Sequence, residues 1–321
     1  MLHAIQKPIQ SELQRYEKVF RAALHSDNPL LSAALTHVTR KLGKMMRPTL
    51  LLLCAREAGE VCEVVLHAAA GLELLHTASL VHDDVVDESD MRRGQRSANA
   101  VFGNKAAVLV GDFITSTALR EINCTSSIEA VGRTAWLGQQ LADGELMQLN
   151  NTQQTTFDEA AYYDVIDRKT AALFATCARL GAFLGGADGE KVEQLSRFGY
   201  LVGRCFQMRD DLFDFDETVQ TGKPRGNDML EGKLTLPVLF ALRDASEHHC
   251  QLALKVRALE ASEQEIQELM VYTIEHGGVE YAEQQMQRLG DEALGLLQPL
   301  HDAEVRQALQ QYVTYVNLRN S

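Results

Sequence analysis

The sequence predicts an all-α protein, folded as one domain of long bundled helices over residues 1–321. Apolar residues recur at intervals of three and four along its long segments, which is the period of one helix face. The six prolines fall at plausible helix starts or in loops, so the long segments stay uninterrupted. No segment sustains the alternating pattern of a half-buried strand.

In chain order, we expect helices at 9–25, 29–41, 48–58, 62–88, 105–122, 127–150, 157–186, 188–216, 234–244, 247–258, 262–276, 279–297 and 302–318. Leu72, Leu75 and Ser79 mark one face of the fourth of these. The segments 64–81 and 170–186 are apolar almost all round, so we expect both at the centre of the bundle. No repeat or linker divides the chain, which favours a single domain.

The composition is that of an ordinary globular protein with an acidic excess. Of the 321 residues, 44 are Asp or Glu and 31 are Lys or Arg, a formal net charge of −13. Proteins that bind nucleic acids normally carry a basic face, so this balance argues against a nucleic-acid partner. Any anionic ligand would have to be held by local cations or by metal ions.

Neither a membrane span nor a disulfide framework is expected. The longest apolar region, 64–81, is interrupted by His67, Glu73 and His76, and the N-terminus lacks the apolar stretch of a signal peptide. The six cysteines lie at long spacings without a Cys-x-x-Cys pair, which indicates reduced, buried thiols. We therefore expect a cytoplasmic protein that does not span a membrane.

The most informative segment is His-Asp-Asp-Val-Val-Asp, which ends at Asp87. Asp83 and Asp87 lie four residues apart, so both carboxylates project from one helix face, where like charges repel. Asp84 lies about 100° away around the helix and would add a bridging contact. A hard divalent cation such as Mg²⁺ would stabilise this arrangement. The alternative is a solvated acidic helix end.

A second segment, Gln-Met-Arg-Asp-Asp-Leu-Phe-Asp, repeats the pattern at Asp210, Asp211 and Asp214. It ends another long apolar helix, and a helix C-terminus already carries negative partial charge. If the two helices face each other across the bundle, their acids define a site that needs metal ions. The repetition favours metal binding over a solvated helix end.

Positively charged residues lie at the ends of the expected core helices. Lys44 and Arg47 precede Pro48, which fits a first helical position, so helix amides and two cations would form a diphosphate cradle. The other cations are Arg92, Arg93, Lys169, Lys223 and Lys233. Each alone is better explained as a surface cation paired with an acid. Their shared position at helix ends, where one mouth of the bundle could gather them, is what indicates a site.

Together these residues resemble the trans-isoprenyl (polyprenyl) diphosphate synthase family, in its long-chain, octaprenyl diphosphate synthase-like branch. The motifs that carry the resemblance are Gly-Lys-x-x-Arg-Pro, His-x-x-Ser-Leu-x-His-Asp-Asp, Arg-Arg-Gly, Lys-Thr, Phe-Gln-x-x-Asp-Asp and Gly-Lys-x-Thr-x-Pro, in that order. The resemblance implies the type I isoprenoid synthase fold, an all-helical bundle around a deep central cavity, usually a homodimer. It also implies a prenyltransferase that joins isopentenyl diphosphate to an allylic diphosphate.

The resemblance assigns roles residue by residue. Mg²⁺, about three ions per active site with substrate bound, would be held by Asp83, Asp84, Asp87, Asp210, Asp211 and Asp214. Isopentenyl diphosphate would be bound by Lys44, Arg47, His76 and Arg93. The allylic diphosphate would be bound by Arg92, Lys169, Thr170, Gln207, Lys223 and Lys233. Lys169 counts as catalytic together with the six acids.

In the chemistry that this implies, metal ions and cations stabilise the departing pyrophosphate. A dry apolar wall protects the allylic carbocation, which the double bond of isopentenyl diphosphate attacks head-to-tail. The proton lost afterwards goes either to the leaving pyrophosphate or to His82, and the sequence leaves this open.

Product length is expected to depend on the side chains below Asp83. Ser79 and Ala78, four and five positions earlier, are small and leave a shaft open, so we expect a long, lipophilic product. The family resemblance implies a length of roughly C30 to C45, as in quinone side chains. Trp136 and Leu137 are candidates for the floor of the shaft, unless Trp136 only packs the core. The expected starter is farnesyl or geranylgeranyl diphosphate.

Three other functions stay open. A shorter-chain synthase would stop at roughly C15 to C20. A terpene cyclase would have no use for the second diphosphate site formed by Lys44, Arg47, His76 and Arg93. A non-catalytic subunit of a heteromeric synthase typically lacks acids in one of the two motifs, whereas both are intact here.

Overall fold

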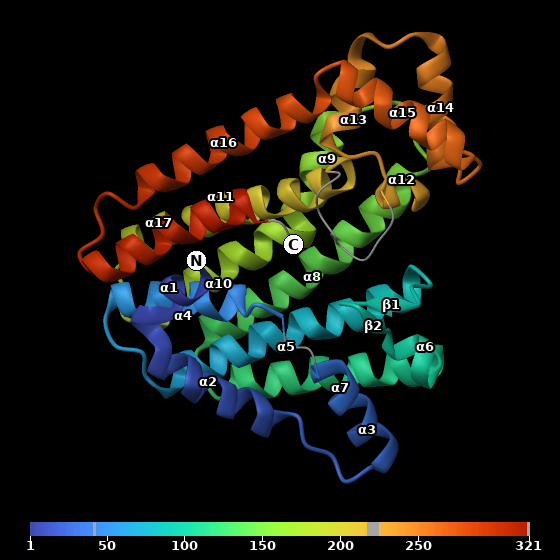
Figure 1. Cartoon of the computed structure of the whole chain (residues 1–321). Helices are drawn as coiled ribbons and strands as arrows, with labels where there is room; N and C mark the ends of the chain where they lie inside the picture. Colours follow the sequence, from blue (N-terminus) through green and yellow to red (C-terminus); the bar gives the residue numbers. More distant parts are fainter. Residues whose placement is uncertain (41–42, 217–224, 320–321) are drawn as a thin grey trace. The chain divides into compact units, whose positions relative to one another are not determined.

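The computed structural model describes residues 1–40, 43–216 and 225–319, and it is almost entirely helical, which confirms the predicted fold class (Figure 1). The chain divides into two compact units. Unit 1 comprises Met1–Gly138, Phe174–Gly199 and Pro299–Leu309, and unit 2 comprises Gln139–Leu173, Tyr200–Gln298 and Gln310–Ser321. That the whole chain acts as one domain stays a prediction.

The helices follow one another largely as the sequence predicts. They are α1 (Leu2–Gln6), α2 (Gln10–Ala23), α3 (Pro29–Thr39), α4 (Met46–Ala58), α5 (Glu63–Val86), α6 (Ala98–Phe102), α7 (Asn104–Asn123), α8 (Ile128–Asn151), α9 (Glu159–Ile166), α10 (Ala172–Leu184), α11 (Gly189–Leu212), α12 (Asn227–Leu230), α13 (Leu236–Ala241), α14 (Glu247–Arg257), α15 (Glu263–Glu275), α16 (Gly278–Leu296) and α17 (Ala303–Leu318). Strands β1 (Met91–Arg92) and β2 (Gln95–Arg96) pair antiparallel, and short 3₁₀ segments occupy Lys7–Ile9, Phe213–Phe215 and Leu242–Asp244. Helices α8, α10, α11 and α17 contribute residues to both units.

Most differences from the expected boundaries concern short elements. The expected helix 157–186 is divided between α9 and α10 by a π-helical segment, Asp167–Ala171. Helices α1, α6 and α12 and the β1–β2 hairpin have too few residues to show a period, so the sequence does not predict them.

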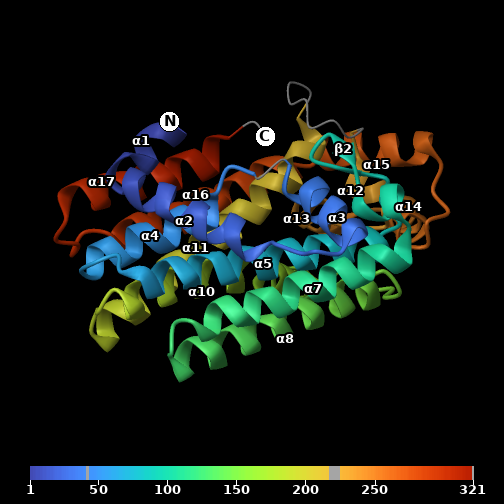
Figure 2. The same cartoon turned by 90° about the horizontal axis from the view of Figure 1, so that it is seen from below.

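Helix α5 is the central helix of unit 1. It packs along α7 and also against α2 and α4, and Figures 1 and 2 show α5 and α7 side by side. Leu72 and Leu74 on opposite sides of α5 are only 1% and 0% exposed, as expected for a helix without a polar face. Helix α5 is long and apolar enough to cross a membrane, but 61% of its apolar window is buried inside the protein, and core helices pass the same test.

All six cysteines are free thiols. Cys54, Cys177 and Cys205 are buried as predicted, and burial raises the pKa of the Cys205 thiol to about 12. Cys62 and Cys250 are half-buried and Cys124 is exposed, so the prediction that all six are buried is wrong at these three positions. Cys124 lies just past the last residue of α7, at the cap of that helix.

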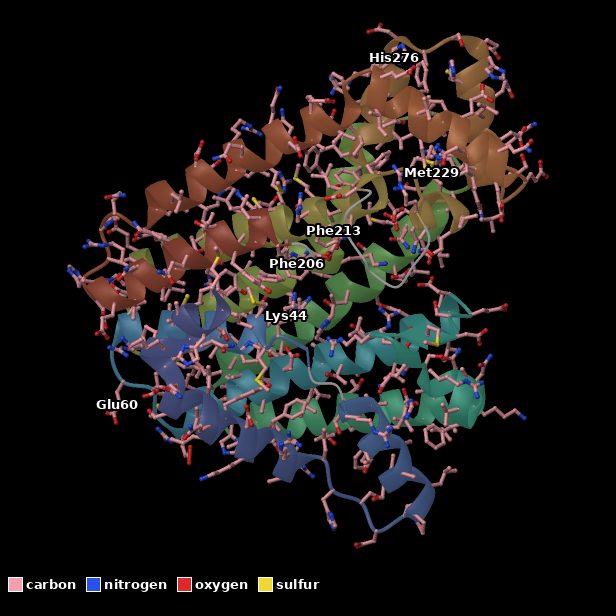
Figure 3. The ribbon with its side chains drawn as sticks, in the orientation of Figure 1. Lys44, Glu60, Phe206, Phe213, Met229 and His276 are labelled. Carbon is pink, nitrogen blue, oxygen red and sulfur yellow. The ribbon has the colours of Figure 1, made fainter. Side chains whose placement is uncertain are left out.

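Helix α13 is buried in unit 2. It packs against α9, α15 and α16, and α14 packs on α15. A compact apolar cluster holds this region together through Phe215, Met229, Val238, Leu242, Ala253, Val256, Ile266, Leu269 and Met270. Figure 3 marks Met229 in this cluster and His276 at the end of α15. The cluster anchors α12 and the loop that follows α11, which carry polar residues of the candidate site.

Candidate active site

The first acidic motif lies at the C-terminal end of α5 in unit 1. The helix ends at Val86, and the backbone N–H of Asp87 donates to the carbonyl of Asp83 over 2.8 Å. Asp84 is only 3% exposed, whereas Asp87 is exposed. The three predicted acids therefore differ in environment although they share one helical end.

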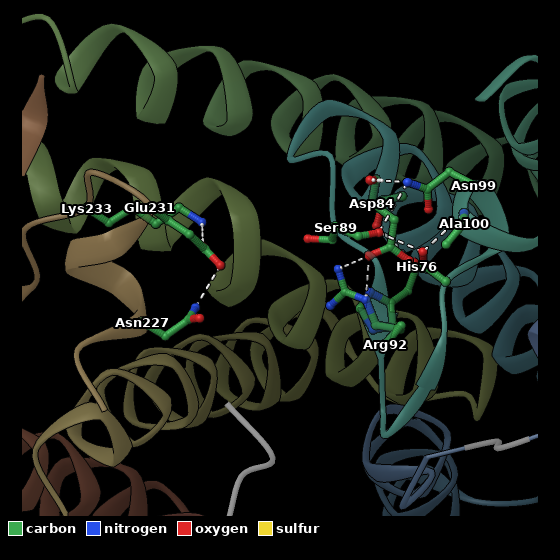
Figure 4. A network of polar contacts seen from close by, with 11 residues as sticks. His76, Asp84, Ser89, Arg92, Asn99, Ala100, Asn227, Glu231 and Lys233 are labelled. Carbon is green, nitrogen blue, oxygen red and sulfur yellow. Dashed lines mark hydrogen bonds and ion pairs between the residues drawn. The ribbon is translucent and has the colours of Figure 1, made fainter. Parts of the chain in front are cut away.

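Asp84 is already paired with a predicted diphosphate-binding residue. The guanidinium of Arg92 donates to Asp84 Oδ1 from Nε over 2.8 Å and from Nη2 over 2.5 Å (Figure 4). The amide of Asn99 donates to the backbone carbonyls of Asp84 and Ser89, which ties the helix end to α6. Arg92 thus supplies the counter-charge that a buried carboxylate needs. A direct metal bond from Asp84 stays a prediction.

Arg93 lies at the tip of the β1–β2 hairpin in a strained backbone conformation. Its φ is 51° and that of the following Gly94 is 67°, so both central residues of the two-residue turn have positive φ. Such turns favour Asn or Gly at the first position, and an arginine there costs free energy. Strained residues of this kind cluster at functional sites. Here the residue in the strained conformation is an arginine, which places its guanidinium at the tip of the hairpin.

Gly43 lies directly against that guanidinium. A Cβ built on Gly43 would stand 3.1 Å from both Cζ and Nη2 of Arg93. The arginine of the hairpin therefore packs closely on the backbone of the first glycine in the Gly-Lys-x-x-Arg-Pro motif, and a side chain at position 43 would displace it. This contact brings Arg93 to the loop that carries Lys44, marked in Figure 3.

We expect Gly43→Ala to raise the KM for isopentenyl diphosphate about three- to tenfold, because the methyl group displaces the Arg93 guanidinium by a few tenths of an ångström. The KM for the allylic diphosphate should change by less than about twofold. Steady-state kinetics with each substrate varied in turn measure both. Gly132→Ala is the matched control, since a Cβ at Gly132 meets no atom within 4 Å. An unchanged KM for isopentenyl diphosphate would contradict this account.

The positive charges of unit 1 surround His76. Burial lowers the pKa of His76 well below its ordinary value, and the nearby guanidinium groups of Arg47, Arg93 and Arg92 lower it further. Arg47 is itself held over the ring of Phe174, 5.1 Å from its centroid. His76 is therefore a neutral hydrogen-bonding group near neutral pH, and the arginines carry the charge.

The second acidic motif spans the end of α11 and the 3₁₀ segment after it, in unit 2. Asp211 is 5% exposed and accepts hydrogen bonds from Tyr162 Oη over 2.6 Å and Gln207 Nε2 over 2.9 Å. Burial raises the pKa of Asp211 to about 7; Asp210 and Asp214 raise it as well, and the two hydrogen bonds act in the opposite direction. Burial and its acidic neighbours therefore disfavour the ionised form of this carboxyl group.

The two neighbouring acids have different partners. Arg319 Nη2 donates to Asp210 Oδ1 over 2.5 Å, and the same guanidinium stacks on Phe206, 3.7 Å from the ring centroid. Figure 3 marks Phe206 at this position near the end of the chain. Asp214 Oδ2 accepts from the backbone N–H of Asp228 over 2.6 Å.

Asp228 adds a further acid to this cluster. Its pKa is raised well above the ordinary value by burial and by the charges of Asp214 and Asp211. A divalent cation would relieve the repulsion in this cluster, and carboxylate oxygens are the donors that such cations prefer. The donor set of the second motif therefore fits a metal ion.

The carboxylates do not form a closed metal cage by themselves. Among the described residues, groups of three ligands with all ligand atoms within 4.8 Å occur at His67, Glu121 and Cys124 and at His248, His249 and Glu268, and not at either acidic motif. Like charges keep such acids apart unless a cation lies between them.

Lys169 and Thr170 lie in the π-helical segment that divides α9 from α10. Lys169 Nζ donates to Gln148 Oε1 over 3.0 Å and forms an ion pair with Glu145. Thr170 Oγ1 donates to Gln207 Oε1 over 2.7 Å, and Gln207 in turn donates to Asp211. Single π-helical turns of this kind are frequent at functional sites. Thr170 is thereby linked to Asp211 through Gln207, and Lys169 lines the same cavity as Asp211.

A cavity of about 380 Å³ in unit 2 gathers these residues. Predicted site residues that line it are Lys169, Gln207, Asp211 and Lys233, and residues that the sequence does not single out are Tyr162, Asp228 and Arg257. Lys233 Nζ contacts Glu231 Oε2 over 2.6 Å, and Asn227 donates to the other oxygen of that carboxylate (Figure 4). Lys223, also predicted for the allylic diphosphate, lies outside the described residues.

The sequence gives no signal for Tyr162 and Arg319. Both act through partners far along the chain, Asp211 and Asp210, so no local spacing reveals them. Asp228 lies fourteen positions after Asp214, in a segment rich in charged residues. The sequence could therefore have suggested it as a further acid of the site.

Of the four residues predicted to limit product length, two are buried and two are half-buried. Ala78 is 1% exposed, and Ser79 is half-buried with its hydroxyl donating to the His76 carbonyl. Leu137 is fully buried, whereas Trp136 is half-buried with the Arg133 guanidinium 3.9 Å from its ring centroid. Their roles stay predictions.

Residues 28–273 match the family model described as Polyprenyl synthetase. The chain belongs to the polyprenyl synthetase family. The octaprenyl diphosphate synthase of Haemophilus influenzae is 36% identical over 95% of this chain and 93% of that protein. Polyprenyl synthetases are prenyltransferases that act on an allylic diphosphate and isopentenyl diphosphate and use divalent metal ions.

Solved structures of polyprenyl synthetases are similar over the full chain. A geranylgeranyl pyrophosphate synthase from Bacteroides thetaiotaomicron is 42% identical with a TM-score of 0.87, and the match covers 99% of both chains. A polyprenyl synthase from Caulobacter crescentus, complexed with calcium and isoprenyl diphosphate, is 29% identical with a TM-score of 0.93, covering 100% of this chain and 98% of that one. The predicted all-α isoprenoid synthase fold is thereby confirmed.

Proposed function

We propose that this polyprenyl synthetase is a long-chain trans-polyprenyl diphosphate synthase that adds isopentenyl units head-to-tail to an allylic diphosphate. One feature supports it most: three arginines, Arg47, Arg92 and Arg93, lie close enough to His76 to lower its pKa, in a protein with a net charge of −13. Positive charge concentrated in this way suits a second diphosphate, which a terpene cyclase does not bind. The acidic motif beside it supplies the donors for metal ions.

In this proposal the two substrates are bound by different groups. Isopentenyl diphosphate is held by the Arg47 and Arg93 guanidinium groups with Lys44, and neutral His76 contributes a hydrogen bond. The allylic diphosphate is held by Arg92, Lys169, Thr170, Gln207, Lys223 and Lys233. Planar guanidinium groups suit phosphate oxygens because each donates two parallel hydrogen bonds.

Magnesium is the proposed metal, with about three ions per site held by the six acids of the two motifs. When bound, it would withdraw electron density from the allylic diphosphate and neutralise the leaving pyrophosphate. Calcium accompanies isoprenyl diphosphate in the Caulobacter crescentus structure, and magnesium shares its preference for oxygen donors. The side chains of Lys169 and Arg92 would stabilise the same developing charge.

The relatives point to different chain lengths. The Haemophilus influenzae relative is named for an octaprenyl product and the Bacteroides thetaiotaomicron relative for a geranylgeranyl product. We favour the long product because Ala78 and Ser79 leave no bulky side chain near Asp83. The product length is therefore proposed from two small residues on α5.

We also propose a cytoplasmic homodimer. Large apolar side chains are exposed along α7 and the first turns of α8, at Val108, Leu109, Leu119, Ile128 and Val131, and Ile128 is 93% exposed. Large apolar side chains exposed on two consecutive helices are typical of a face that another protein covers. A second copy of the chain is the partner that the family resemblance favours.

We expect purified protein with Mg²⁺, farnesyl diphosphate and isopentenyl diphosphate to form a ladder of intermediates that ends in one product of roughly C30 to C45. Chromatography of the dephosphorylated products measures this. Omission of isopentenyl diphosphate is the control, because a cyclase would still consume the allylic substrate. Products no longer than C20 would show that the protein is a shorter-chain synthase. If no isopentenyl unit is incorporated, the non-catalytic subunit is the remaining alternative.

A further inference from the structure

Glu73 is a buried acid in the most cationic part of unit 1. It lies on α5, three positions before His76, and is 9% exposed. One of its carboxylate oxygens, Oε2, is buried and accepts no hydrogen bond from the described residues. A buried carboxylate in that condition is costly unless nearby positive charge compensates it.

Glu73 faces a cavity that it shares with the arginines of the hairpin. This cavity measures about 40 Å³, and Glu73, Thr77 and Asp84 line it from one face of α5. Arg92, Arg93 and Gln95 line it from the hairpin, and the other lining residues are His37, Val38, Leu80, Val81, Arg96, Ser97 and Ala98. The spacing of 73, 77 and 84 places the two carboxylates on the same side of the helix, three turns apart.

The charges of Glu73, Arg47 and Arg93 affect the pKa values of Glu73 and Arg93. Burial raises the pKa of Glu73, and Arg47 and Arg93 counteract that shift. Burial lowers the pKa of Arg93, and the negative charge of Glu73 counteracts it. Asp84 has Arg92 as its close partner, and Glu73 is a second buried acid, which lines the same cavity as Arg93.

The hairpin that carries Arg93 is fixed at its base. Gln95 Nε2 donates to the His37 carbonyl over 3.2 Å, and the His37 ring contacts the Arg96 carbonyl over 2.8 Å. Ser97 Oγ donates to the Ser89 carbonyl over 2.6 Å. Because the base of the hairpin is fixed, the backbone of Arg93 is restricted by its positive φ, and its guanidinium is restricted by the backbone of Gly43. Glu73 faces Arg93 across the cavity that both residues line.

We propose that Glu73 is a positioning residue for the isopentenyl diphosphate site: its carboxylate, which lines the same cavity as Arg93, supplies the negative charge that keeps the Arg93 guanidinium in place for the diphosphate. The inference rests on the proposed function, since it deepens the role given to Arg93. A counter-charge beside a partly buried guanidinium compensates its desolvation and keeps it in place before the substrate arrives.

Glu73→Gln keeps the shape and removes the charge. We expect the KM for isopentenyl diphosphate to rise about tenfold, with kcat and the KM for the allylic diphosphate within about twofold of the wild type. Glu73→Asp retains the charge one methylene further away and should raise the same KM only about threefold. A KM for isopentenyl diphosphate that falls or stays constant would overturn the proposal, and so would equal increases for both substrates.

Glu57→Gln is the matched control. Glu57 is likewise a buried acid of unit 1, with Lys191 Nζ 2.8 Å away and the backbone N–H of His301 donating to it over 2.9 Å. Its loss should lower the melting temperature without changing the KM for isopentenyl diphosphate. If Glu73→Gln behaves in the same way, its role is only structural and the proposal is wrong. If Glu73→Gln does not fold, the Glu73→Asp kinetics decide.

A binding measurement separates this inference from the proposed function. Titration calorimetry with inorganic pyrophosphate, in buffer without metal ions, reports the cationic site while the metal-dependent sites stay unfilled. We expect Glu73→Gln to weaken this binding about tenfold. If the wild-type chain shows no synthase activity but Glu73→Gln still weakens pyrophosphate binding, the role of Glu73 is supported and the proposed function is wrong. Unchanged pyrophosphate binding would refute the role of Glu73 whatever the activity.

Discussion

Asp83→Asn is expected to reduce kcat by about three orders of magnitude. The substitution removes one of the two carboxylates that lie four residues apart at the end of α5, and a neutral amide is a poor ligand for a hard divalent cation. The Mg²⁺ concentration for half-maximal activity should rise as well. Initial rates measured over a range of Mg²⁺ concentrations give both values.

Loss of activity in Asp83→Asn should not come from loss of folding. Like charges at this helical spacing destabilise a helix by a few tenths of a kcal/mol, so without metal ions the variant should be as stable as the wild type or slightly more so. Asp90→Asn is the control, since Asp90 is an exposed acid just beyond the same helix end. A variant that keeps a tenth of the wild-type kcat at saturating Mg²⁺ would show that Asp83 holds no metal.

The second large effect concerns product length. Ala78→Phe is expected to shorten the product to roughly C15 to C20, because Ala78 lies five positions before Asp83, or about 7.5 Å along the helix. A phenyl ring there would block a chain growing beneath the acidic motif, while both diphosphates still bind. Chromatography of the products from the same assay measures the change.

Extra volume at a buried position has a cost of its own. Ala78 is 1% exposed, and overpacking at such sites typically destabilises by about 1–3 kcal/mol. Ala69→Phe is the matched control, since Ala69 is equally buried and nine positions earlier, which is the opposite face of α5. Both variants should lose stability, and only Ala78→Phe should shorten the product. An unchanged product in Ala78→Phe would mean that Ala78 does not border the growing chain.

Helix content and the residues of the motifs could be predicted because their signals are local. Apolar residues spaced by three and four located α5 and α11 to within a few positions, and the repeated acid spacing located Asp83 and Asp210. The boundary at Asp167–Ala171 could not be predicted, since a π-helical turn differs from an α-helical one by a single inserted residue. The exposure of Cys124 likewise depends on where α7 ends.

By itself, the sequence determined the fold class, the family and the kinds of charged group in the site, because periodicity and motif spacing depend on neighbours within a few turns. Only the tertiary structure decided which acidic side chain lies beside which basic one. Arg92 pairs with Asp84, Arg319 reaches Asp210 from the far end of the chain, and Glu73 lines one cavity with Arg92 and Arg93. Such pairings depend on burial and distance between elements, which the order of residues does not encode locally.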